Sequence, residues 1–206
     1  MSIIVYHMTH IQNLPSIINA GVLYCDRQAQ ERQARGIAYI NFKQKRRFKA
    51  VPVPPNGVIA DYVPFYFAPC SPMLFAIHTG YVDASLTQSE IVYLATTVEA
   101  IVDAGKSFVF TDRHSLSPVA RFCNDLNQLN HYVDWQVMRS SYWHDTLEYP
   151  DRKSRRQAEF LVYQAVEWTL ILGIGVYDQA HLAQVNALLA HAPHKPPVQV
   201  QRGWYY

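Results

Sequence analysis

Most hydrophobic positions of this 206-residue chain fall in short runs rather than in long helical repeats. Runs enriched in β-branched and aromatic residues are typical of strands. The predicted strands are Tyr6–Thr9 (the end of a first strand), Tyr62–Ala68, Ile91–Thr96, Phe108–Thr111, Phe160–Val166, Leu170–Val176 and Val198–Tyr206.

Three segments show helical patterns instead. Leu14–Ala20 has Pro15 in its first turn and Gly21 directly after its end, as is usual for a short helix. Pro72–His78 is a second short helix, and His181–His191 repeats apolar residues at helical spacing.

The remaining segments are irregular. Three prolines make Val51–Gly57 an extended connector, and Leu116–Trp135 mixes helix with loop. Arg27–Lys49 is polar, basic and weakly periodic, so we expect an exposed insertion around a ligand. Strands dominate without regular β-α alternation, which predicts an α+β fold with a mixed, twisted sheet in one domain, residues 1–206.

The composition is that of an ordinary globular protein, with 50% hydrophobic and 17% charged residues. The longest apolar runs, such as Trp168–Tyr177, are shorter than the roughly 18 residues of a membrane span. Met1–Ile11 lacks the pattern of a signal peptide. Cys25, Cys70 and Cys123 are odd in number and far apart, which indicates a reducing cytoplasm rather than a disulfide framework.

Basic residues are concentrated in two places although the net charge is only +2. Eight of the 18 lysines and arginines lie in Arg27–Lys49, and four more lie in Arg152–Arg156. Such clusters suit a phosphate-rich partner. A solvated charged face is the alternative interpretation.

Common nucleotide and metal motifs are missing from the sequence: it has no GxGxxG, no Walker loop and no HExxH. His7 and His10 lie three positions apart, but no cysteine or carboxylate cluster completes a metal site. We therefore expect no metal.

Two groups of residues do indicate chemistry. Tyr6–His10 places several hydrogen-bonding side chains at the end of a strand, where a structurally satisfied histidine is the alternative. Arg155–Glu159 places a carboxylate beside guanidinium groups at the start of an apolar run. A buried carboxylate is costly unless it is paired or used, so a structural ion pair is the alternative there.

Motifs across nearly the whole chain carry a resemblance to a known family. They are Tyr6–His10 with Asn13–Ile17, Lys45–Arg46, Val51–Pro55, Asp61–Pro69 with Ser71–Leu74, Phe108–His114, Asp134–Trp135, Arg156–Glu159 and Gly203–Tyr205. The long, unusual block from Asp61 to Leu74 is the most specific of these. With them the chain resembles the DarT family of DNA ADP-ribosyltransferases, the toxins of bacterial toxin–antitoxin pairs.

The resemblance implies an enzyme that cleaves the nicotinamide–ribose bond of NAD+ and places ADP-ribose on a base of single-stranded DNA, which is thymine in the commoner branch. It implies an ADP-ribosyltransferase core, a split mixed sheet with short flanking helices, in agreement with the α+β prediction. It also implies NAD+ as co-substrate, no metal, and a macrodomain antitoxin as partner.

Residue by residue, the resemblance makes Glu159 the catalytic glutamate and Arg46 the arginine of the DNA-side chemistry. Arg47 stays an alternative to Arg46, because the alignment through this basic run can slip by one position. A charged guanidinium has no acceptor lone pair, so we expect it to stabilise a thymine N3 anion and hold the pyrophosphate rather than take a proton.

The resemblance implies further contacts on both substrates. Expected NAD+ contacts are His7, Met8, Thr9, Ser16, Tyr24 and Arg46, and a loop at about 28–48 closes on NAD+. A loop at about 114–159 selects the acceptor. Expected DNA contacts are Arg47, Tyr62, Tyr66, Met73, His114, Arg155 and Arg156, with Trp143 as a further stacking aromatic.

Cys70, Phe48 and Ala50 depart from the family pattern and leave the base preference open. Two other functions therefore compete with DNA modification. One keeps the fold and NAD+ but uses RNA, tRNA or protein as acceptor. The other is a binding module for nucleic acid without catalysis, although such a module needs neither Glu159 nor His7.

Overall fold

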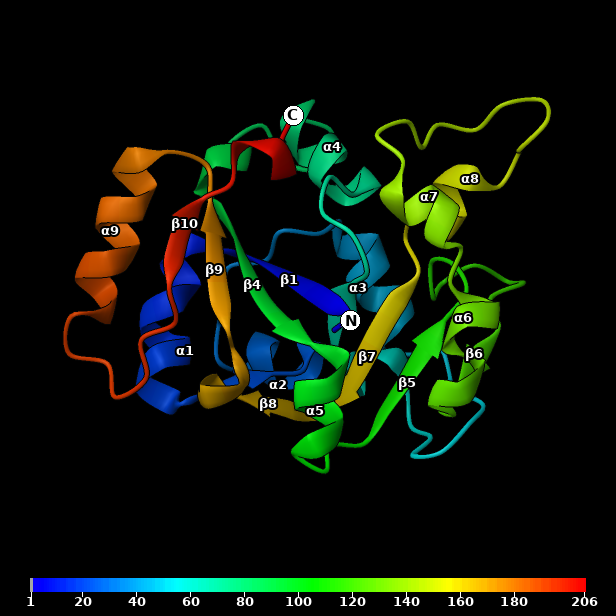
Figure 1. The fold of residues 1–206 in the computed structure, drawn as a ribbon, viewed down its shortest axis with the longest axis horizontal. Helices are drawn as coiled ribbons and strands as arrows, with labels where there is room; N and C mark the ends of the chain where they lie inside the picture. Colours follow the sequence, from blue (N-terminus) through cyan, green and yellow to red (C-terminus); the bar gives the residue numbers. More distant parts are fainter. Residues whose placement is uncertain (1) are drawn as a thin grey trace.

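Short apolar strands pair into one eight-stranded sheet in the computed structural model, which describes residues 2–206. The strand order is β10-β9-β4-β1-β3-β7-β5-β6, and every described pair in it is antiparallel except β9 with β10 (Figure 1). The strands are β1 (Ile4–His10), β3 (Tyr62–Tyr66), β4 (Ile91–Thr97), β5 (Phe108–Thr111), β6 (Phe122–Cys123), β7 (Glu159–Tyr163), β9 (Gly173–Val176) and β10 (Val198–Val200). A separate two-stranded sheet joins β2 (Val22–Tyr24) to β8 (Ala165–Glu167).

The helices are short and lie around the large sheet. They are α1 (Leu14–Ala20), α2 (Asp26–Glu31), α3 (Ile40–Arg46), α4 (Pro72–His78), α5 (Val98–Asp103), α6 (Leu129–Tyr132), α7 (Trp135–Arg139), α8 (Arg152–Arg155) and α9 (Gln179–Leu189). α1 ends at Gly21, whose φ of 66° places it in the left-handed region that glycine adopts without strain. Figure 1 shows α1 and α9 at one end of the molecule and α6, α7 and α8 at the other.

The predicted α+β class with a mixed sheet is confirmed, and most predicted strands and helices are present. Three predicted strands are wrong in part. Leu170–Val176 is a strand only from Gly173, because Trp168–Leu170 form the 3-10 turn η5. Phe160–Val166 is divided at Gln164, whose positive φ turns the chain from β7 into β8. Val198–Tyr206 is a strand only to Val200, after which residues Arg202–Trp204 form a 3-10 turn, here η6.

Large side chains fill both faces of the sheet. One face carries the main core, which includes Val5, Phe65 and Phe160. The other carries a smaller cluster that includes Met8, Tyr66 and Tyr93. Residues 204–206 pack with this cluster. Because both faces are covered, neighbouring residues of a strand are buried alike.

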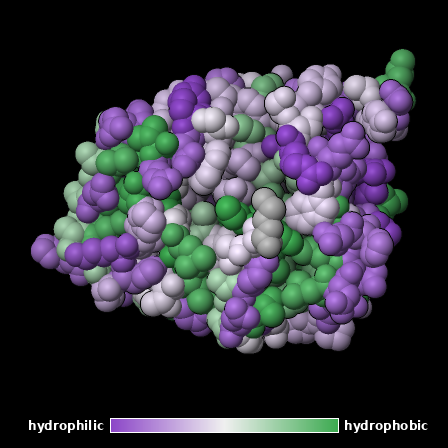
Figure 2. Space-filling view, in the orientation of Figure 1, coloured by the Kyte–Doolittle hydropathy of each residue, from purple (hydrophilic) through white to green (hydrophobic). Residues whose placement is uncertain are grey.

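On the surface, hydrophobic and hydrophilic side chains are interspersed (Figure 2). Among residues 2–206, no helix has both the length and the apolar character that crossing a membrane requires.

Gly175 of β9 lies against the indole ring of Trp204, and a Cβ there would overlap that ring. We expect Gly175→Ala to lower the free energy of unfolding by about 1–3 kcal/mol, because the ring must shift to admit the methyl group. Urea unfolding measures this. Gly203→Ala is the matched control, since a Cβ at Gly203 meets nothing within 4 Å. Equal unfolding midpoints for the two variants would contradict this packing.

Candidate functional site

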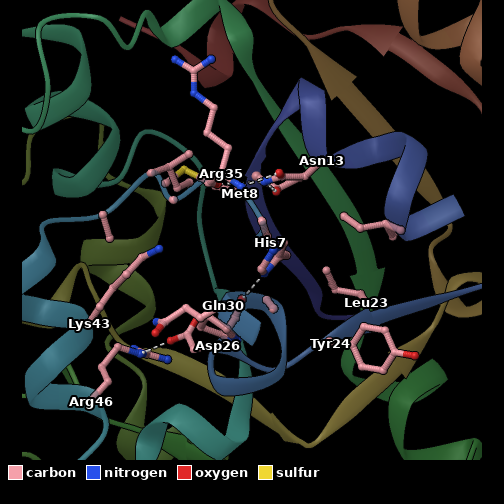
Figure 3. Close-up of a pocket in the computed structure, with 18 of the residues that line it drawn as sticks. His7, Met8, Asn13, Leu23, Tyr24, Asp26, Gln30, Arg35, Lys43 and Arg46 are labelled. Carbon is pink, nitrogen blue, oxygen red and sulfur yellow. Dashed lines mark hydrogen bonds and ion pairs between the residues drawn. The ribbon is translucent and has the colours of Figure 1, made fainter. Parts of the chain in front are cut away.

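A cavity lies between β1 and the segment that contains α2 and α3. His7, Met8 and Thr9 of β1 form one wall, Ser16 of α1 and Tyr24 of β2 another. Asp26, Gln30, Lys43 and Arg46 from α2 and α3 enclose it on a third side, as Figure 3 shows. Glu159 lies at its inner end, with Tyr66, Met73 and His114 beside it.

Glu159 is the first residue of β7, and its side chain is inside the protein with 1% exposure. Its Oε1 accepts a hydrogen bond from Nη1 of Arg46 at 2.8 Å, and its Oε2 accepts one from the backbone N–H of Ser115 at 3.1 Å. Burial alone would raise the pKa of Glu159, but Arg46, His114 and these hydrogen bonds outweigh it and hold the pKa below its usual range. The buried carboxylate is therefore ionised.

Arg46 joins two carboxylates. Besides Glu159, it contacts Asp26 of α2, with 2.5 Å between Nε and Oδ2 (Figure 3). Burial would lower the pKa of the Arg46 guanidinium, but Asp26 and Glu159 outweigh burial and raise it. Its Nη2 is buried and has no hydrogen-bond partner among residues 2–206. A charged donor is thus free for an anionic ligand in the cavity.

Two neutral histidines flank this pair. Nδ1 of His7 lies 2.8 Å from the carbonyl oxygen of Pro64, so Nδ1 donates and Nε2 is left as an acceptor. Nδ1 of His114 accepts from the N–H of Leu116 at 3.2 Å, so its proton is on Nε2. Burial lowers the pKa of both imidazoles. His7 therefore offers an acceptor and His114 a donor.

Asn13, in the 3-10 turn η1 (Ile11–Asn13), binds the segment of residues 32–38, which covers the cavity. Its amide oxygen accepts from the N–H of Arg35 at 2.8 Å, and its amide nitrogen donates to the carbonyl oxygen of Arg35 at 2.9 Å. The same nitrogen donates to Oγ1 of Thr9 at 3.0 Å. These bonds tie the backbone of Arg35 to η1 and β1, and Ile37 of the same segment packs in the core cluster that contains Met8.

An open groove continues from the cavity on the side of α4. Tyr66, Met73 and His114 line both spaces, so the two meet beside Glu159. Tyr39 and Lys45 line one bank of the groove, Phe75 the other, and Lys153, Ser154 and Gln157 its far end. The groove combines aromatic rings with ammonium groups, the chemistry that binds unpaired nucleic-acid bases and their phosphates.

The structure brings most of the predicted site residues together. His7, Met8, Thr9, Ser16, Tyr24, Arg46 and Glu159 line the cavity, and Tyr66, Met73 and His114 line its junction with the groove. Arg47, the alternative to Arg46, is exposed and bonds Gln30. The geometry therefore favours Arg46.

Four of the predicted DNA contacts do not line the groove. One is Arg47, and the other three are corrected here. Tyr62 is fully buried, with its hydroxyl on the carbonyl oxygen of Asn56. Arg156 is also buried and donates to the backbone carbonyls of Pro69, Val137, Met138 and Ser140. Arg155 pairs with Asp134 and Asp151, away from the groove.

Trp143 is also buried, so the expectation that it is a free stacking ring is wrong. Its indole instead packs against His144 and Phe75.

Sequence reasoning missed Asp26, Asn13 and the lysines of the groove. Asn13 lies within a segment that carried the resemblance, and Asp26 starts a helix directly after a strand, but neither pattern shows which partner the side chain meets. Lys45 and Lys153 belong to the two basic clusters, which do contribute to the groove. No three His, Cys, Asp or Glu side chains among residues 2–206 are grouped to hold a metal ion.

Comparison with known proteins gives one consistent family. Residues 6–206 match the family model described as "ssDNA thymidine ADP-ribosyltransferase, DarT". A DNA ADP-ribosyl transferase of Thermus sp. (strain 2.9) is 42% identical over 204 residues, which cover 98% of this chain and 95% of that protein.

Solved structures of the Thermus sp. 2.9 DarT superpose closely. The complex with ADP-ribosylated single-stranded DNA has a TM-score of 0.92 and 40% identity, covering 99% of this chain and 96% of that one. The complex with NAD+ has a TM-score of 0.88 and 40% identity, covering 99% and 98%.

The ionised Glu159 makes stability depend on pH in acid. Its folded-state pKa lies below the ordinary value of about 4.3, so its stabilisation is present above that value and is lost as the pH falls through the folded-state pKa. We expect the difference in unfolding free energy between wild type and Glu159→Gln to shrink from about pH 6 to pH 3. Urea unfolding across this range measures it, with Glu148→Gln, an exposed carboxylate, as control. A difference that is constant with pH would contradict an ionised Glu159.

Proposed function

The chain belongs to the DarT family of single-stranded-DNA thymidine ADP-ribosyltransferases, and we propose that Glu159 and Arg46 carry its reaction at the junction of cavity and groove. In the overall reaction, the bond between nicotinamide and ribose of NAD+ breaks and nicotinamide leaves with the electron pair. N3 of thymine forms the new bond to the same ribose carbon, and its proton is released. The ionised Glu159 bonded to Arg46, between the two spaces, is the observation that supports these roles.

Glu159 stabilises positive charge. The departure of nicotinamide leaves positive charge at the anomeric carbon, and a carboxylate in a dry site is the group that stabilises it most. The same carboxylate holds the ribose 2′-hydroxyl as an acceptor. Because Ser115 N–H and Arg46 keep it ionised, no proton has to be removed before it acts.

Arg46 acts as a charge rather than as a base. Two carboxylates raise the pKa of its guanidinium, which makes it a poorer proton acceptor than an ordinary arginine. Its Nη2 is buried and has no hydrogen-bond partner among residues 2–206, so it is the donor available to a ligand. There it stabilises the anion that forms when thymine loses its N3 proton, and Asp26 keeps the guanidinium in place.

The cavity suits NAD+ by its donor set. The backbone and side chains of His7, Met8 and Thr9 form the wall for the nicotinamide ribose, and Ser16 and Tyr24 lie farther along it. Arg46 and Lys43 supply positive charge for the pyrophosphate. Residues 28–48 are the loop that closes on NAD+. The Asn13 side chain holds this loop through hydrogen bonds to the Arg35 backbone.

The groove is the site for the acceptor strand. Lys45 and Lys153 pair with phosphates, while Tyr66 and His114 lie where the target base meets Glu159. A base paired in a duplex hides its N3 atom, so the chemistry requires a single strand. Residues 114–159 form the loop that selects the acceptor, within one catalytic domain that spans residues 1–206.

In the cell, we place the protein in the cytoplasm as the toxin of a toxin–antitoxin pair. Its substrates, DNA and NAD+, are found there, and its three cysteines are unpaired. The family resemblance supports a macrodomain antitoxin that removes the modification. An RNA or protein acceptor is the competing function. The rings and lysines of the groove favour a nucleic acid over a protein. A binding module without catalysis has no use for the buried pair of Glu159 and Arg46.

Replacing each arginine by lysine separates the two candidates. Arg46→Lys keeps the charge but cannot reach Asp26 and Glu159 together, so we expect kcat to fall at least about 100-fold. Arg47→Lys changes an exposed side chain and should stay within about 2-fold of wild type. Nicotinamide release in the presence of single-stranded DNA measures both. The reverse order would assign the function to Arg47.

Mass spectrometry of oligonucleotides tests the acceptor. We expect incubation with NAD+ to add one ADP-ribose to thymine-containing single strands and nothing to thymine-free strands. Glu159→Ala should lose at least about 1000-fold in rate, since the carboxylate acts on developing charge.

Three other outcomes of this oligonucleotide experiment would be informative. Modification of guanine-containing strands alone would keep the reaction and change the base. Nicotinamide release without DNA modification would indicate an RNA or protein acceptor. No release in wild type would contradict catalysis.

A further inference from the structure

A cluster of aromatic rings supports the bank of the groove that α4 forms. Phe75 of α4 lines the groove, and its ring centroid lies 5.2 Å from that of Tyr206, 5.7 Å from Trp143 and 5.8 Å from His144. Tyr206 also stacks on His78 at the end of α4. This side of the groove therefore packs against Trp143 and His144, from the connection between α7 and α8, and against Tyr206.

The Tyr206 hydroxyl joins these parts by hydrogen bonds, the longest of which is 3.4 Å to the carbonyl oxygen of Ser71. It accepts from Nε1 of Trp143 at 2.9 Å and donates to the carbonyl oxygen of Cys70 at 2.8 Å. Cys70 lies at the corner between β3 and α4 and has a positive φ of 52°, in the left-handed region that few residues other than glycine adopt. One hydroxyl thus ties the connection to the corner where α4 begins.

Trp143 is the anchor of an otherwise exposed connection. Between Arg139 and Arg155, all of which the structure describes, it is the only buried side chain, at 2% exposure. Residues 140–151 contain no helix or strand. Hydrogen bonds from Arg156 to the Ser140 carbonyl oxygen and from the Lys153 N–H to Asp145 also hold this connection. Trp143 is its one buried side chain, and the polar end of that indole bonds Tyr206.

Arg156 holds the same corner from the other side. Its Nη2 donates to the carbonyl oxygen of Pro69 at 2.6 Å, while Nη1 donates to those of Val137 and Met138 in α7. The corner of residues 69–71 is thus fixed twice to the acceptor loop, once by Arg156 and once by Tyr206.

We infer that Tyr206 is a positioning residue for acceptor binding: its hydroxyl fixes Trp143 of the connection, and the rings of Tyr206 and Trp143 together hold Phe75, the member of this cluster that lines the groove for the DNA strand. This inference rests on the proposed function, because it takes the groove as the DNA site. Tyr206 lines neither the cavity nor the groove. Its loss should therefore weaken DNA binding and leave NAD+ binding and the chemical step unchanged.

The test is Tyr206→Phe, which keeps the ring and removes the hydroxyl. Trp143 then has a buried N–H without a partner, so we expect the KM for a thymine-containing single strand to rise roughly tenfold. The value of kcat at saturating DNA and the Kd for NAD+ measured by calorimetry should stay within about 2-fold of wild type.

Tyr205→Phe is the matched control. The Tyr205 hydroxyl is also buried and donates to the carbonyl oxygens of Ile91 and Gly175, far from the connection. It should cost stability without changing the KM for DNA. Trp143→Phe should raise that KM as Tyr206→Phe does, and the double variant should rise no further, because both remove the same contact.

Hydrogen exchange of residues 140–151 measures the anchoring without any substrate, and we expect faster exchange in Tyr206→Phe only. An unchanged KM for DNA, an equal rise in Tyr205→Phe, or a parallel loss of NAD+ affinity would each overturn the inference. If wild type modifies no DNA, the proposed function fails instead, and unchanged exchange would then also refute the anchoring.

Discussion

The ion pair between Arg46 and Glu159 is the interaction on which the site depends. Two charges removed from water are costly unless each is fully paired, and removal of one leaves the other uncompensated. Asp26 and the Ser115 N–H supply further partners, and Nη2 of Arg46 is left without one among residues 2–206. Four separate segments thus meet at these two side chains, so the geometry of the site and the local packing are one arrangement.

Around this pair, the two substrate spaces differ in how they are built. The cavity is formed by a regular strand on one side and by a polar cover on the other, held through the Asn13 amide. The groove has α4 on one side and, at its end, Lys153 and Ser154 of α8 with Gln157 just after that helix. The cavity therefore depends on side-chain contacts to its cover, whereas much of the groove is built on two helices.

Local patterns in the sequence predicted the elements whose signals are local. Leu14–Ala20 matches α1 because Pro15 and Gly21 mark its ends, and the apolar runs that became β4 and β5 needed no long-range information. Tyr62 was misjudged because strand β3 is buried on both faces and shows no alternation. Arg156 was misjudged because its partners are carbonyls up to 87 positions away, so nothing in a run of arginines shows which one turns inward. Cavity residues were found through the family motifs, whereas Asp26 and Tyr206 act through contacts that no motif displays.

The order of strands in the sheet also bears on when activity first exists. Arg46 and Glu159 are 113 positions apart, and β7 lies between β3 and β5, which are translated earlier. β1 pairs with β4, and β4 with β9, so the central sheet also waits for late segments. Domains generally fold as units during synthesis. A chain that stops before residue 159 therefore carries Arg46 without its carboxylate partner, and the pair that the site depends on exists only once β7 has been made.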